Sequence, residues 1–225
     1  MKAEELLFFF RRGFIPGPNE SEETFLKRAI SRPQLSLCEW KEISHPLLEQ
    51  WGFSIDWIPI SYSSTKLLPW EGAVFWAKED GTSSIQLKAY STEILMHEAI
   101  HAAREAFDEP VFEEFLAYMT STAAWKRWVG PMFQRVWEFP FFALAVFFIP
   151  FFPVVASITL AYFIGRLLYR HFFFCRIKKQ VPLSVLLCLT DREIRSGKIS
   201  QTSSLRLQLI EALFDVEDLI PNLLS

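Results

Sequence analysis

The sequence predicts an α+β fold of three parts: a small domain with a short antiparallel sheet and a pair of packed helices (residues 1–135), a transmembrane helical hairpin (136–174), and amphipathic C-terminal helices (175–225). Short stretches rich in β-branched and aromatic residues precede two stretches with helical periodicity. A long run without any charged residue follows them. The chain then continues with apolar residues spaced for one face of a helix.

The composition narrows the class of protein. Hydrophobic residues make up 51% of the 225 residues and aromatic residues 16%, unlike the polar composition of disordered chains. The net charge of −3 gives no reason to expect nucleic-acid binding, which needs a clustered positive surface. Cys38, Cys175 and Cys188 show no CxxC spacing, so neither a disulfide framework nor a thiolate zinc cluster is expected. Glu4 and Glu5 stand where a signal peptide needs positive charge, so none is expected.

The first part of the chain is expected to alternate between helices and strands. One helix begins near Asn19, an N-cap residue with Glu22 three positions further on. A second, short helix covers residues 45–51 and stops at Gly52. Three strands are expected at residues 53–62, 73–78 and 84–90, the last two joined by a hairpin turn at 79–82.

Two helices follow the strands, at residues 92–107 and 110–125, and the first carries the motif HEAIH. Residues four apart share a helix face, so His97 and His101 can bind one metal ion. Glu98 then stands beside the ion, where it can take a proton from bound water and return it to a leaving amine. Because the other side chains make this helix apolar nearly all round, the two histidines and the glutamate predict a metal site.

A third ligand is expected on the second helix, because catalytic zinc takes three protein ligands and keeps one position open for water. With a tight connection at residues 108–110, His101 lies about 9 Å and Glu114 about 6 Å from the turn, on facing helices. Tyr118 lies one turn beyond Glu114, level with the gap between His97 and His101. Glu114 is therefore the candidate ligand, and Tyr118 is expected beside the same site.

HEAIH followed by EEFLAY resembles the zincin metalloproteases of the gluzincin type, over about residues 84–122. The resemblance implies zinc as the cofactor, held by the two motif histidines and Glu114, with Glu98 as the general base. Glu114 followed by Ala117 matches the family's spacing, and Glu113 does not.

The same resemblance implies where substrate binds. The strand before the motif helix, residues 85–89, would pair with an extended peptide. Tyr118 and His171 are the candidates for the residue that stabilises the oxyanion. Glu113, with Glu109 and Asp108, is interpreted as capping the second helix or orienting a ligand histidine.

Residues 139–165 contain no charged residue and are long enough for one bilayer span. Pro150 and Pro153 interrupt this run, because proline removes a helical donor and clashes with the preceding turn. Both flanks are basic, which favours a hairpin turning at the prolines over a single span and keeps the catalytic domain on the cytoplasmic side. Arg166 and Arg170 are interpreted as snorkelling anchors. A single span and a very apolar soluble helix pair remain alternatives.

Amphipathic helices are expected at residues 181–197 and 203–220, packed either on the first domain or against the bilayer. The whole pattern predicts a membrane-anchored zinc metallopeptidase that acts on a peptide or protein substrate beside the membrane. It predicts contact with membrane lipid and none with nucleic acid. Two alternatives stay open: a non-catalytic membrane-associated adaptor that retains a zincin-like fold, and a zinc hydrolase for a non-peptide amide or ester. The substrate and the oligomeric state are not predicted.

Overall fold

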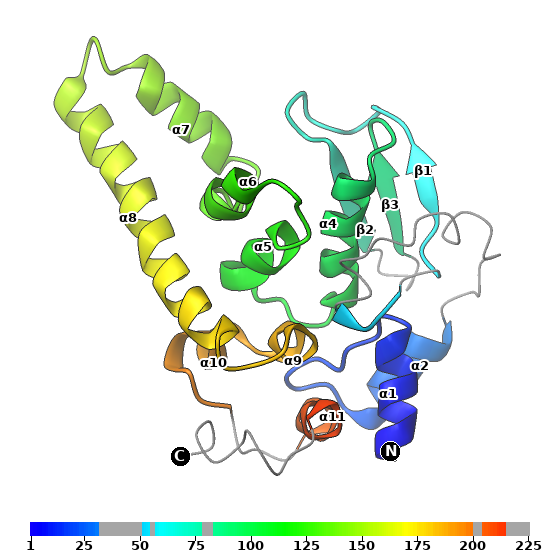
Figure 1. Ribbon diagram of the computed structural model, residues 1–225. Coiled ribbons are helices and arrows are strands. Elements are labelled where there is room, and N and C mark those ends of the chain that lie inside the picture. Colours follow the sequence, from blue (N-terminus) through cyan, green and yellow to red (C-terminus); the bar gives the residue numbers. More distant parts are fainter. Residues whose placement is uncertain (32–50, 55–56, 78–82, 200–203, 215–225) are drawn as a thin grey trace.

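The computed structural model describes residues 1–31, 51–54, 57–77, 83–199 and 204–214. A small sheet and the helices packed on it form one side of the molecule, and a long helical hairpin rises from the other (Figure 1). The strands are β1 (Ile60–Tyr62), β2 (Ala73–Ala77) and β3 (Ser83–Leu87). The helices are α1 (Ala3–Arg11), α2 (Glu22–Ser31), α4 (Thr92–Ala103), α5 (Pro110–Tyr118), α6 (Ala124–Val129), α7 (Glu138–Phe147), α8 (Pro153–Lys178), α9 (Leu183–Cys188), α10 (Asp191–Ser196) and α11 (Leu205–Leu213), with a 3-10 turn, η1, at Gly130–Met132.

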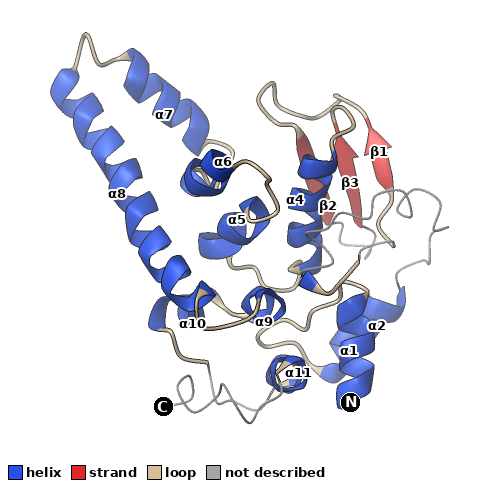
Figure 2. Cartoon of the chain, in the orientation of Figure 1, coloured by secondary structure: helices blue, strands red, loops and turns tan. Residues whose placement is uncertain are grey.

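The described sheet is mixed, with strand order β1-β3-β2 (Figure 2). β2 and β3 are antiparallel, with Ala77 opposite Ser83, and β1 runs parallel to β3. The prediction of a purely antiparallel sheet was therefore wrong for β1. This strand begins at Ile60, whereas the prediction placed its start at residue 53. β3 lies in the centre, so the expectation that residues 85–89 form the substrate-pairing edge was also wrong. Among the described strands, the edge strand that contacts α4 is β2. The expected turn at 79–82 lies outside the described residues.

α4 packs against β2 and β3 because its apolar residues surround it almost completely. It begins where the Ser91 hydroxyl accepts a hydrogen bond from the Ile94 amide, an N-cap interaction. It ends at Ala103, four residues earlier than predicted. The guanidinium of the next residue, Arg104, is buried and donates to the carbonyls of Leu187 and Leu189. The end of the helix is thus tied to a distant segment of the chain, which local periodicity does not reveal.

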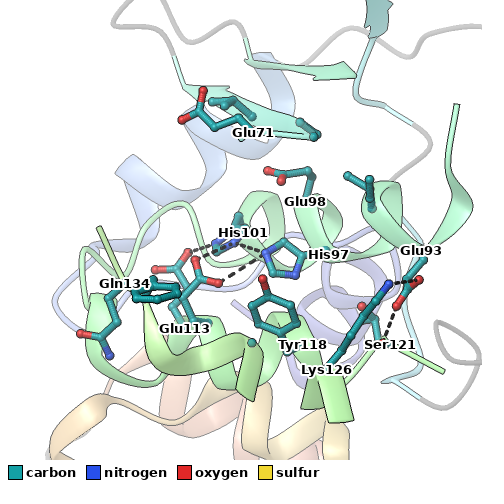
Figure 3. A pocket seen from close by; sticks show the side chains of 18 of the residues that line it. Glu71, Glu93, His97, Glu98, His101, Glu113, Tyr118, Ser121, Lys126 and Gln134 are labelled. Carbon is teal, nitrogen blue, oxygen red and sulfur yellow. Dashed lines mark hydrogen bonds and ion pairs between the residues drawn. The ribbon is translucent and has the colours of Figure 1, made fainter. Parts of the chain in front are cut away.

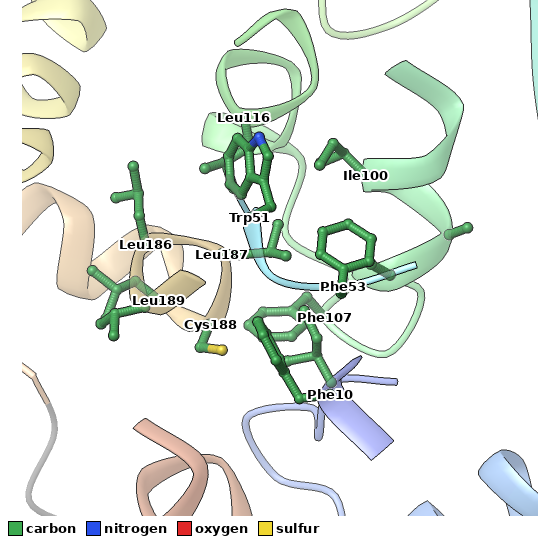
Figure 4. Close-up of a cluster of buried hydrophobic side chains, with 14 of the residues drawn as sticks. Phe10, Trp51, Phe53, Ile100, Phe107, Leu116, Leu186, Leu187, Cys188 and Leu189 are labelled. Carbon is green, nitrogen blue, oxygen red and sulfur yellow. The ribbon is translucent and has the colours of Figure 1, made fainter. Parts of the chain in front are cut away.

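The C-terminal helices were expected either on the first domain or against the bilayer. The structure packs them on the first domain. Apolar residues of α9 enter the same core as residues of α1, α4 and α5, as Figure 4 shows around Phe10, Ile100, Leu116 and Leu187. α11 lies against α1, and no helix was predicted for α1. α2 begins at Glu22, with Ser21 accepting from the Thr24 amide, so Asn19 is not its N-cap. The predicted helix at 45–51 lies almost wholly outside the described residues.

α7 and α8 form a helical hairpin that turns at the predicted prolines, but the prediction of a transmembrane hairpin was wrong. In the part of the chain that the structure describes, no helix has both the length and the apolar character that a bilayer crossing requires. α7 has only 10 residues. α8 has 26 residues, but charged residues begin at Arg166, a little beyond its midpoint. The charge-free run is therefore divided between two helices by the break at Pro150 and Pro153.

Candidate metal centre

Three candidate metal ligands converge between α4 and α5 (Figure 3). The Nε2 atoms of His97 and His101 lie 3.2 Å apart. His97 Nε2 lies 3.5 Å from Glu114 Oε2, and His101 Nε2 lies 3.5 Å from the other oxygen, Oε1. With one ligand atom taken from each residue, all three atoms lie within 4.8 Å of one another. A tetrahedral zinc ion with ligands at about 2.1 Å requires ligand atoms about 3.4 Å from one another. The chemistry of these three donors suits zinc, and their grouping could hold a metal ion.

Glu113 contacts the far side of His101. Its Oε1 lies 2.7 Å from His101 Nδ1, so the Nδ1–H donates a hydrogen bond to the carboxylate and Nε2 faces Glu114. Burial lowers the pKa of His101, but the hydrogen bond to Glu113 and the charges of Glu114 and Glu98 outweigh burial and raise this pKa to about 10. The surrounding carboxylates thus favour a cation between the imidazoles, whether a proton or a metal ion.

The charge state of Glu114 suits a metal ligand. Burial raises the pKa of Glu114, but the hydrogen bond from His97 and the charges of both histidines outweigh it, so the pKa is lowered. Glu114 is consequently ionised at neutral pH, as a carboxylate ligand must be.

Glu98 is 8% exposed and lines the same pocket as the three ligand candidates. In Figure 3 its carboxylate lies on the side of the histidine pair toward the sheet, and Tyr118 lies on the opposite side. Glu98 follows His97 directly on α4, so one buried helix supplies both histidines of the candidate site and a carboxylate beside them.

Tyr118, the last residue of α5, packs edge-on against His97, with 4.6 Å between ring centroids. Its ring also lies directly on the backbone of Gly130. A Cβ at Gly130 would come within 2.4 Å of the Tyr118 ring, so only glycine permits this contact. Burial, with the charges of Glu114 and Glu98, raises the pKa of Tyr118 to about 12, so the phenol keeps its proton. The structure therefore brings a hydrogen-bond donor to the metal site.

The rim of the pocket is held by a polar cluster that joins the start of α4 to α6 (Figure 3). The Glu93 carboxylate accepts hydrogen bonds from the Ser121 hydroxyl and from Lys126, the latter at 2.8 Å. The hydrogen bonds from Lys126 and Ser121 lower the pKa of Glu93 despite its partial burial. This cluster fixes α6 and η1, and with them Gly130, over the metal site.

The pocket above the ligands has a volume of about 810 Å³. Residues 72–75, at the start of β2, form one wall. Residues 133–136 and Phe139, at the base of α7, contribute to the other. Trp70 and Phe139 also line the pocket and pack on each other, with 5.9 Å between ring centroids. Of the described strands, β2 pairs only with β3, so its outer edge runs along the pocket.

His171, the other candidate for oxyanion stabilisation, does not reach this pocket. Its Nε2 lies 2.7 Å from the Trp128 carbonyl, and its ring stacks on Trp128 and meets Phe115 edge-on. His171 therefore holds α8 against α5 and α6 and has no place at the site.

Glu109 and Asp191 act at the start of α5. The Asp191 carboxylate accepts hydrogen bonds from the amides of Val111 and Phe112, while Glu109 accepts one from the Asp191 amide. The capping expected of Glu109 is therefore supplied mainly by Asp191, from a distant part of the chain. Asp108 takes a positive φ of 47° in the connection to α5.

Comparison with known proteins yields no relative. No protein-family description, no curated protein and no solved structure matches the chain.

The sequence did not indicate several parts of the site. Gly130 beside Pro131 indicates a turn. Nothing in the neighbouring sequence indicates that the Tyr118 ring occupies the space that a side chain at position 130 would fill. Val136 and Phe139, which belong to one wall of the pocket, were assigned to the transmembrane hairpin. The pocket edge of β2 follows only from the strand order.

Proposed function

We propose that this chain is a zinc-dependent hydrolase that cleaves peptide bonds. The observation that carries the proposal is the convergence of three donors, His97, His101 and Glu114, whose ligand atoms lie within 4.8 Å of one another beside a buried glutamate in a pocket. Core histidines can pair with carboxylates without a metal. Two imidazole Nε2 atoms turned toward one carboxylate are instead typical of a catalytic zinc site with two His ligands and one Glu ligand.

Zinc bound by these ligands supplies a Lewis acid, which polarises a carbonyl group and lowers the pKa of water. Glu98 accepts the proton of the attacking water and returns it to the amine that leaves. Glu113 fixes the ring of His101 by its hydrogen bond to Nδ1. Tyr118 donates a hydrogen bond to the negative charge that develops on the carbonyl oxygen, since its hydroxyl retains its proton.

The outer edge of β2 favours a peptide as the substrate. Its residues 73–75 line the pocket, and an extended chain could add to this edge through main-chain hydrogen bonds. The apolar wall formed by Trp70 and Phe139 would receive a side chain of that peptide. A non-peptide ester or amide would gain nothing from the strand edge, so the edge argues for peptides.

Glu98→Gln separates a hydrolase from a non-catalytic adaptor, because it removes the base and leaves the three ligands in place. We expect the variant to bind zinc as the wild type does and to lose at least 100-fold in kcat on a library of unstructured peptides. Glu211→Gln, the same change at an exposed position of α11, is the control and should remain active. Full activity of Glu98→Gln with zinc bound would refute the hydrolase.

A further inference from the structure

The α7–α8 hairpin ends in an exposed apolar tip, which we define as residues 139–165. Large apolar side chains point outward from both helices and from the turn between them. The following are between 51% and 71% exposed: Phe141, Leu144, Phe147, Phe151, Phe152, Val154, Val155 and Ile158. A monomeric protein in water rarely leaves so large a contiguous apolar surface uncovered.

Contacts between the two helices use only one side of each. The rings of Phe142 and Phe163 meet edge-on, with 5.6 Å between centroids, and Ala156 is buried. The outward sides remain apolar around most of the circumference. A docking site for a protein typically offers one apolar face with a polar rim, whereas an apolar surface on all sides suits a hydrocarbon environment.

The dimensions of the tip match one leaflet. α7 has 10 residues, which corresponds to a length of about 15 Å. The charge-free part of α8, from Pro153 to Gly165, is about 20 Å long. The hydrocarbon core of a bilayer is about 30 Å thick, so the tip reaches about its middle.

The base of the hairpin carries positive charge and amphipathic rings. Between residues 125 and 171 the sequence has five basic side chains and one acidic one, Glu138. Lys126 pairs with Glu93 and Arg166 with Glu138. Arg127, Arg135 and Arg170 remain as positive charges that form no ion pair with another described residue. The chain as a whole has a net charge of −3, so this region departs from the rest of the molecule. Trp137 and Tyr162, at 53% and 62% exposure, lie near the boundary between tip and base. Cations and such rings are favoured at the level of anionic headgroups.

We propose that the hairpin tip inserts into one leaflet of an anionic phospholipid bilayer and seats the molecule on the membrane surface without crossing it. Phe139, at the base of α7, also lines the metal-site pocket. The seated molecule therefore holds its pocket next to the headgroups. This proposal concerns the hairpin and stands whether or not the pocket has hydrolytic activity.

Flotation with phospholipid vesicles tests the insertion. The full chain is incubated with vesicles of phosphatidylcholine containing 30% phosphatidylglycerol and centrifuged through a density gradient. Phe147→Asp combined with Val155→Asp changes two exposed side chains, so the fold should survive. Ile30→Asp, at a position of α2 that is 70% exposed, is the matched control. We expect the wild type and the control to float, and at least tenfold less of the double variant to do so.

Three outcomes would overturn the proposal. The wild type could stay at the bottom of the gradient, or the double variant could float as well as the wild type. Alternatively, the wild type could form an oligomer that the double variant dissociates without any vesicle binding, which would make the tip a protein contact.

Depth is measured with a fluorophore on Phe147→Cys, in a chain whose three native cysteines are replaced by alanine. Lipids brominated on their acyl chains should quench it. Quenching by an impermeant reagent trapped inside the vesicles would show that the tip crosses the bilayer, and would contradict insertion into one leaflet.

Discussion

At the scale of single residues, the orientation of His101 depends on Glu113, although Glu113 is not among the three ligands. The 2.7 Å contact with Nδ1 holds the ring and leaves Nε2 directed at Glu114. Such supporting carboxylates contribute one to two orders of magnitude to metal affinity (about 10- to 100-fold).

Glu113→Gln should therefore weaken zinc binding by about 10- to 100-fold while the fold is retained. The amide keeps the size of the side chain and removes its charge. Competition with a chromophoric chelator measures the affinity, and circular dichroism checks the fold. Glu211→Gln serves again as the control for loss of one negative charge. An affinity equal to that of the wild type would mean that Glu113 does not support the site.

Gly130 matters because it has no side chain. A Cβ there would lie 2.4 Å from the Tyr118 ring, far inside van der Waals contact. Gly130→Ala should displace the ring and lower the free energy of unfolding by about 1–3 kcal/mol.

Gly165→Ala is the matched control for Gly130→Ala. Nothing lies within 4 Å of a Cβ at Gly165, and the residue is inside α8, so the stability should rise by up to about 1 kcal/mol. Chemical denaturation of both variants checks the pair. Equal effects of the two substitutions would contradict the close packing of Tyr118 on Gly130.

At the scale of elements, α5 supplies Glu113, Glu114 and Tyr118, and its start is capped from outside. The Asp191 carboxylate accepts from the Val111 and Phe112 amides, two of the groups that a helix N-terminus leaves without partners. The C-terminal segment thus positions the ligand helix.

Asp191→Ala should cost about 1–2 kcal/mol in the free energy of unfolding, because it leaves both amides without their acceptor. Arg192→Ala, at the exposed neighbouring position, should cost much less. Urea denaturation of the two variants provides the comparison. If both lose the same stability, the cap is not the reason.

The base of α7 is held by an ion pair that depends on pH. Burial raises the pKa of Glu138, but the hydrogen bonds from Arg166 and from the Gln134 amide outweigh it and lower the pKa below its ordinary value of 4.5. A carboxyl group whose pKa is lower in the folded state stabilises that state above its unfolded pKa. The contribution is lost as the pH falls through the folded pKa.

Glu138→Gln should therefore be less stable than the wild type at pH 7, and the difference should shrink as the pH falls below about 4.5. Denaturation curves of both proteins between pH 3 and pH 7, recorded in the same buffer and detergent, measure this difference in stability. A difference that stays constant over this range would show that the ionised pair contributes nothing.

The elements also show which parts of the fold were predictable. Local patterns predicted the β2–β3 pair, α4, the start of α5 at Pro110 and the turn between α7 and α8, because each rests on neighbouring residues. The end of α4 and the cap of α5 could not be predicted, since Arg104 and Asp191 find their partners about 80 residues away.

The residues of the candidate site also fall into those that local sequence predicts and those that depend on distant segments. His97, Glu98 and His101 are recognisable from one helical turn, and Glu114 from its height on the next helix. Gly130 and the pocket edge of β2 depend on how distant segments pack. The turn at the prolines was predicted correctly, but the transmembrane hairpin was wrong because neither α7 nor α8 is both long and apolar enough to cross a bilayer.

At the scale of the whole molecule, the many apolar side chains lie in two places. One part fills a core that joins the N-terminal helices, the α4–α5 pair and α9 to α11. The other part lies outward on the hairpin tip, where no described segment covers it. The candidate metal site lies between these two regions, with the three candidate ligands on α4 and α5 and part of its pocket wall at the base of the hairpin.

The metal content of the full chain tests the central claim most directly. Protein purified without chelator is analysed by mass spectrometry for metals, together with His97→Ala and Glu211→Gln. We predict one zinc ion per wild-type and per Glu211→Gln chain and much less in His97→Ala. A chelator should also lower the Tm of the wild type, because an ion that binds only the folded state stabilises it. A wild-type chain that contains no zinc, takes none up when it is supplied, and unfolds at the same temperature with and without chelator would contradict the account.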